Sequence, residues 1–103
     1  MFLPDHINQL YDQFSEKVYH PQFLDQKSTE LIALACSVMA DCVPCIEFHY
    51  QQAANAGAGQ NEISEALAVA MSICAGSKRA KYMTLIASLE EKILGGVARS
   101  EEI

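Results

Sequence analysis

The sequence predicts an all-α protein: a compact, oligomeric bundle of about five helices, with one domain over residues 1–103 and its core at 27–94. Three observations carry this prediction. The chain has 103 residues, of which 50% are hydrophobic and 19% charged, enough for the core of one domain. Apolar residues recur at spacings of three and four along much of the chain. Strand signals are nearly missing, because β-branched residues do not cluster and no Asn-Gly or Asp-Gly hairpin pair occurs.

The first helix is expected over residues 5–19. Its apolar residues repeat at helical spacing and leave the charged side chains on the opposite face. The pair His20-Pro21 ends it, because the residue before a proline avoids the α conformation. The apolar positions are Ile7, Leu10, Tyr11, Phe14 and Val18.

The next two helices are expected over residues 28–40 and 41–56. The first of them carries Thr29 and Glu30 in its opening turn and is otherwise apolar all round. Asp41 is a suitable N-cap for the following helix, and Pro44 is tolerated in its first turn, where N–H groups lack intrahelical partners. Glycines at 57 and 59 indicate its end.

The last two helices are expected over residues 61–76 and 77–94. Asn61 and Ser77 are their predicted N-caps, Gly76 separates them, and Gly95-Gly96 is the predicted terminator before an acidic tail. The second and fourth helices have no polar face over most of their length, so each must be covered on nearly every side. We therefore expect a homo-oligomer; the alternative is a monomer in which the first and fifth helices wrap across them.

Charge and hydropathy exclude several functions. The net charge is −6 with seven scattered basic residues, which disfavours nucleic-acid binding. The longest uncharged apolar stretches, 31–40 and 66–76, are about half of the ~20 residues that a membrane-spanning helix needs. The first residues carry an early acid and no apolar h-region, so we expect no secretory signal and a cytoplasmic protein.

One segment, Asp41-Cys42-Val43-Pro44-Cys45-Ile46-Glu47-Phe48-His49, carries the chemistry. At the start of a helix, Cys42, Cys45 and His49 fall on one stripe of one face. A helix N-terminus favours a thiolate over a thiol of ordinary pKa about 8.5, a second cysteine can resolve an oxidised one, and a histidine can accept the thiol proton. A redox dithiol without metal or cofactor is therefore our preferred hypothesis.

Other interpretations of this segment stay open. Cys42, Cys45 and His49 could hold zinc if Cys74 or His20 completed the site, and the cysteines could instead be buried small hydrophobes. A c-type haem signature fails because Ile46 stands where histidine is required. We expect Cys36 and Cys74 to behave as small hydrophobes, and His6 and His20 to lie at the surface.

The chain contains a glutamate, a Cys-x-x-Cys pair and a histidine at a characteristic spacing: eleven residues separate Glu30 from Cys42, and three separate Cys45 from His49. This pattern resembles that of AhpD-type alkylhydroperoxidases in the carboxymuconolactone decarboxylase superfamily. The resemblance covers roughly residues 27–87. It implies an all-α homo-oligomer, a trimer or hexamer, that reduces hydroperoxides and is re-reduced by an external dithiol. It also implies that Cys45 attacks the peroxide, that Cys42 resolves it, and that His49 and Glu30 form a proton relay.

Two features qualify the resemblance. Pro44 stands where the well-studied peroxidases carry a histidine, so the thiol loses a polar neighbour. The decarboxylases of the superfamily lack the cysteine pair, which makes a non-redox decarboxylase or lactonase that uses His49 as its base the alternative. Without the resemblance, Glu30 is simply a carboxylate in the first turn of a helix, stabilised there by the helix dipole.

Overall fold

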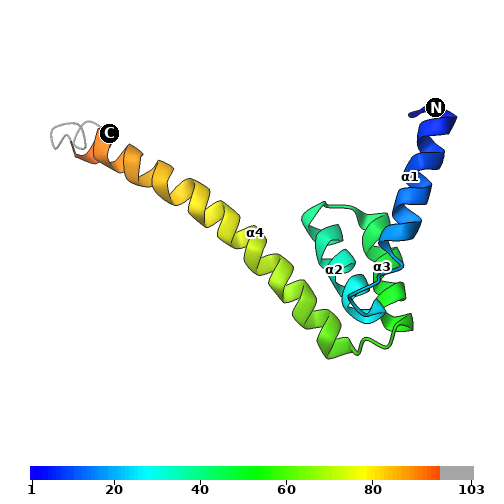
Figure 1. Ribbon diagram of the computed structural model, residues 1–103. Coiled ribbons are helices and arrows are strands. Elements are labelled where there is room, and N and C mark those ends of the chain that lie inside the picture. The colour runs from blue at the N-terminus through cyan, green and yellow to red at the C-terminus, as the bar shows by residue number, and fades with distance from the viewer. Residues whose placement is uncertain (96–103) are drawn as a thin grey trace. The chain divides into compact units, whose positions relative to one another are not determined.

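The computed structural model describes residues 1–95 of the chain and confirms the all-α class (Figure 1). Within these residues lie four α-helices: α1 (Asp5–Val18), α2 (Gln26–Met39), α3 (Val43–Asn55) and α4 (Gln60–Leu89). A short π-helical segment, η1 (Glu90–Leu94), continues directly from α4. No described residue belongs to a strand. None of the described helices is long and apolar enough to cross a bilayer.

The chain divides into two units, residues 1–70 and residues from 71 onward. In the first unit, α2 and α3 pack extensively against each other. Its core consists of Leu34, Ala53 and Ile63, which come from α2, α3 and the first turn of α4. The prediction of one compact five-helix bundle is therefore wrong: the described core is built from the α2–α3 pair and the start of α4.

The predicted fourth and fifth helices are one continuous helix, α4, so the predicted break at Gly76 and the predicted cap at Ser77 are wrong. A glycine inside a helix costs only about 1 kcal/mol relative to alanine, and the neighbouring alanines and basic residues favour the helix. Apart from its chain neighbours and the nearby backbone of its own helix, no atom of residues 1–95 lies within 4 Å of the position that a Cβ at Gly76 would take, so no close contact there requires this glycine. Gly95 follows η1 as its C-cap, whereas Gly96 and the acidic tail lie outside the described residues.

Two helices begin earlier than predicted. The α2 helix begins at Gln26 rather than Ser28, because the Asp25 carboxylate accepts a hydrogen bond from the Ser28 N–H at 2.6 Å. The α4 helix begins at Gln60, so Asn61 lies inside it rather than at its cap. There the Glu62 carboxylate, on the third residue of the helix, accepts the Gly59 N–H at 2.9 Å, as the glutamate of a capping box does.

Candidate active site

A tight turn between α2 and α3 positions the first cysteine. The Cys42 N–H donates to the Ser37 carbonyl at 3.0 Å, and Asp41 adopts the left-handed conformation with φ 54°. Aspartate tolerates that conformation better than most residues. As a result Cys42, and not Asp41 as predicted, is the N-cap of α3.

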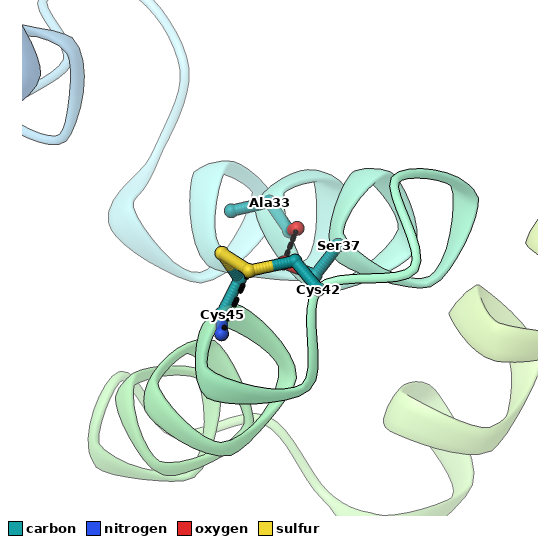
Figure 2. Close-up of a disulfide and its surroundings, with 4 residues drawn as sticks. All are labelled: Ala33, Ser37, Cys42 and Cys45. Atoms are coloured by element: carbon teal, nitrogen blue, oxygen red, sulfur yellow. Dashed lines mark hydrogen bonds between the residues drawn. A yellow bond between two sulfur atoms is a disulfide. The ribbon is translucent and has the colours of Figure 1, made fainter. Parts of the chain in front are cut away.

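Cys42 and Cys45 form a disulfide across the first turn of α3, with their Cα atoms 5.2 Å apart (Figure 2). The Cys45 N–H donates to Cys42 Sγ at 3.3 Å, so this sulfur satisfies one of the unpaired N–H groups at the helix start. Ser37 of α2 lies beside the pair, and its hydroxyl donates to the Ala33 carbonyl. Both cysteines are half-buried, so the sulfurs lie at the N-terminus of a helix and are not sealed in the core.

One turn further along α3, His49 pairs with Glu30 of α2. His49 Nδ1 lies 2.7 Å from Glu30 Oε2, and the two residues are 7% and 3% exposed. With Glu30 as a carboxylate, Nδ1 carries the proton and donates it, and Nε2 of a neutral ring is left as an acceptor. The packing of α2 on α3 thus joins two residues that are 19 positions apart in sequence.

Besides Phe48, whose ring meets the imidazole edge-on at 5.1 Å, two further residues contact this pair, and neither was predicted from the sequence. Gln26 Nε2 donates to Glu30 Oε1 at 3.1 Å and to the Tyr19 carbonyl at 3.1 Å. The Tyr19 ring lies against the imidazole of His49, with ring centroids 4.7 Å apart. The i, i+4 spacing of Gln26 and Glu30 was visible in the sequence, whereas the contact of Tyr19 depends on the path of the chain between α1 and α2.

Two pockets of the first unit open onto the same pair of side chains, Cys45 and His49. The larger pocket, about 750 Å³, is also lined by polar residues including Glu16, Gln26 and Gln52. The smaller one, about 470 Å³, is lined mostly by apolar groups of α2 and of the residues just before it. Cys42 lines neither of these two pockets, so Cys45 is the cysteine of the disulfide that lines them.

The remaining cysteines and histidines behave differently from one another. Cys36 is exposed and lines the smaller pocket, whereas Cys74 is half-buried in α4; that both behave as small hydrophobes stays a prediction. His6 and His20 are exposed as predicted, and His20 Nδ1 donates to the Glu16 carbonyl at 2.6 Å. In the described part of the chain, no three acidic, cysteine or histidine side chains converge as metal ligands. The sulfurs of Cys42 and Cys45, two of the ligands in the zinc hypothesis, are bonded to each other in a disulfide.

The fold and the site together define a class of helical protein that holds a Cys-x-x-Cys pair at a helix start, next to a buried histidine–carboxylate pair. The chain belongs to the carboxymuconolactone decarboxylase family, whose model matches residues 6–88. It is 33% identical over 85 residues to "Uncharacterized protein 4 in cox locus" of Paracoccus denitrificans, a match that covers 82% of this chain and 77% of that protein. A crystal structure of a protein from Methanobacterium thermoautotrophicum is similar with a TM-score of 0.73 and 33% identity, over 82% of this chain and 97% of that one.

Proposed function

We propose that this protein is an AhpD-type, thiol-dependent peroxidase that reduces hydroperoxides through a Cys42/Cys45 dithiol–disulfide cycle. One observation carries the proposal: Cys45 and His49 together line both pockets, whereas Cys42 lines neither. A small molecule that enters either pocket meets the Cys45 sulfur and the imidazole side by side. Cys42 lies one turn away, with its Cα 5.2 Å from that of Cys45, close enough for the two cysteines to form a disulfide.

The cycle balances in three steps. The Cys45 thiolate attacks one oxygen of the hydroperoxide, the O–O bond breaks, and the other oxygen leaves as an alcohol after taking up a proton. This leaves a sulfenic acid on Cys45, which the Cys42 thiol attacks, so that water departs and the disulfide forms. An external dithiol then reduces the Cys42–Cys45 disulfide by thiol–disulfide exchange. Both cysteines return to thiols, and the external dithiol is oxidised to a disulfide.

His49 and Glu30 supply the proton transfers. His49 lies four residues after Cys45 on α3, which places the two side chains on the same face, one turn apart. Its Nε2, free of Glu30, accepts the Cys45 thiol proton and later delivers one to the departing oxygen. Glu30 stabilises the imidazolium that forms in between, because its carboxylate remains bonded to Nδ1. Pro44 lines the larger pocket and brings no second imidazole to the thiol.

Single cysteine replacements test this assignment. We expect Cys45→Ser to abolish hydroperoxide turnover, and Cys42→Ser to allow one oxidation per subunit and then stall, as measured by stopped-flow peroxide consumption and thiol titration. Cys74→Ser is the matched control, because that thiol lies in α4 outside both pockets, and it should turn over normally. Equal steady-state rates in the Cys45→Ser and Cys42→Ser variants would contradict the proposal.

A non-redox activity is the second candidate, and the buried His49–Glu30 pair favours it, since this pair is a general base with or without a thiol beside it. The family name points to the same chemistry. A decarboxylase or lactonase of this kind would retain its activity when both Cys42 and Cys45 are replaced by serine. The peroxidase would retain none, so the double variant separates the two candidates.

A further inference from the structure

The side-chain amide of Gln26 connects three parts of the site. Gln26 is the first residue of α2, and its Nε2 lies 3.1 Å from both the Tyr19 carbonyl oxygen and Glu30 Oε1. Both partners are acceptors, so the nitrogen and not the oxygen of the amide must lie between them. The amide therefore donates both of its N–H groups, one to the end of α1 and the other to the buried carboxylate.

These two hydrogen bonds affect the geometry of His49. Glu30 Oε1 accepts a hydrogen bond from Gln26, and Oε2 is hydrogen-bonded to His49 Nδ1. The carboxylate therefore cannot rotate without breaking one of these hydrogen bonds. The same amide holds the Tyr19 backbone, and the Tyr19 ring lies against the imidazole at 4.7 Å. Gln26 thus restrains both the carboxylate that bonds the imidazole and the backbone of Tyr19, whose ring contacts the imidazole together with that of Phe48.

We infer that Gln26 is a positioning residue for the His49–Glu30 relay, which it serves by holding the Glu30 carboxylate with Oε2 toward His49 Nδ1. This inference rests on the proposed peroxidase function. Gln26 does not exchange a proton with Cys45 itself. Its effect passes through the imidazole: when Nδ1 keeps its proton, the unprotonated Nε2 remains available to the thiol.

Nuclear magnetic resonance of the imidazole nitrogens tests the positioning role without any activity assay. In the unsubstituted protein we expect His49 to populate one neutral tautomer, with a slowly exchanging proton on Nδ1. In Gln26→Leu and Gln26→Glu we expect a mixture of tautomers and faster exchange of that proton. Glutamate has nearly the shape of glutamine, but its carboxylate oxygen would face the two acceptors, the Tyr19 carbonyl and Glu30 Oε1. The glutamate variant therefore removes the donor while keeping the packing, whereas the leucine variant removes the whole amide. Gln51→Leu is the matched control, since Gln51 bonds only Asn55 among the described contacts and lies outside both pockets.

A second readout connects the geometry to the reaction. In a Cys42→Ser background, we expect Gln26→Leu to slow the single oxidation of Cys45 by hydrogen peroxide about 3- to 10-fold, the effect of losing the hydrogen bond that holds Glu30, and to shift the pH profile of the rate. Gln26→Glu should be at least as slow, and Gln51→Leu unchanged. Circular dichroism checks that all variants keep the same helix content.

The possible outcomes separate this inference from the proposed function. Tautomer populations that do not respond to either Gln26 replacement overturn it, and so does an unsubstituted protein in which His49 already populates both tautomers. An altered tautomer with an unchanged oxidation rate also overturns it, because the amide would then serve the fold alone. If Gln26 controls the tautomer but the unsubstituted protein does not react with peroxide, the proposed function fails while the structural premise stands.

Discussion

The His49–Glu30 pair is the part of the site whose energetics depend most on single atoms. Both side chains are almost fully buried, and one hydrogen bond joins His49 Nδ1 to Glu30 Oε2. A buried polar group that loses its partner costs about 1–3 kcal/mol, and a charged group costs more. The relay is therefore sensitive to replacements that preserve shape but change charge.

Replacement of Glu30 by glutamine tests the charge of the relay. The amide oxygen can still accept the Nδ1 proton, so the hydrogen bond to His49 can persist, but the amide nitrogen then faces the Gln26 donor and the negative charge that stabilises the imidazolium is gone. We expect Glu30→Gln to slow the single oxidation of Cys45 by about 100-fold, near the lower end of what a general base contributes. Stopped-flow oxidation in the Cys42→Ser background measures this rate.

Glu47→Gln is the matched control, because Glu47 is an exposed carboxylate on the same helix as the thiol and lines neither pocket. It should leave the rate unchanged. If the Glu30 and Glu47 variants slow the reaction to the same extent, long-range charge and not the relay is responsible.

At this scale, local spacing predicted the cysteine pair and His49, but not the partners of His49. A helix start with cysteines three apart and a histidine four further on places these residues on one face, whatever the remainder of the fold does. Glu30 was identified only through a family resemblance, because nothing local distinguishes it from any acid in a first turn. Tyr19 was missed, since its contact depends on how the segment between α1 and α2 returns over α3.

The helical segments were predicted from the sequence, whereas their number and several of their ends were not. The bounds of α1 were predicted to within one residue, whereas α2 and α4 each begin before the predicted position. Several polar residues compete at each start, and the cap is the one whose oxygen reaches an N–H two or three residues on. The break at Gly76 was wrong because a glycine weakens a helix only slightly when nothing else ends it.

The caps of α2 and α4 predict how stability depends on pH. The hydrogen bond from Ser28 lowers the pKa of Asp25, and the bonds from Gly59 and Lys27 lower the pKa of Glu62. A carboxylate whose pKa is lower in the folded state stabilises that state fully above its unfolded pKa, and the stabilisation is lost as pH falls through the folded pKa. We therefore expect both caps to weaken in acid.

Asp25→Ala tests this expectation by thermal unfolding followed with circular dichroism. The variant should melt at a lower temperature than the unsubstituted protein at neutral pH, and the difference should shrink as pH falls below the ordinary carboxyl pKa. Asp12→Ala, an exposed acid of α1 away from both caps, should show no such trend. A melting difference for Asp25→Ala that stays constant across this pH range contradicts the cap interpretation.

At the scale of the molecule, large apolar side chains remain exposed on several helices of the described chain. Leu10 and Phe14 of α1 are exposed, as are Ile32 of α2 and Val69 and Ile73 of α4. Soluble monomers rarely expose contiguous apolar surface of more than a few hundred Å², and larger patches mark interaction sites. The sequence had already indicated that the second predicted helix and the fourth, over residues 61–76, need covering on nearly every side.

We expect a second copy of the chain to provide this cover, in a trimer or a hexamer. Light scattering coupled to size-exclusion chromatography should give three or six times the 11.3 kDa subunit mass. Ile73→Asp, which places a charge on the exposed apolar surface of α4, should shift the protein toward monomers, because burying an unpaired charge costs of the order of several kcal/mol. Gln13→Asp adds the same charge on the polar side of α1 and should leave the mass of the oligomer unchanged. An unsubstituted protein that runs as a monomer at every concentration would refute the expectation of an oligomer.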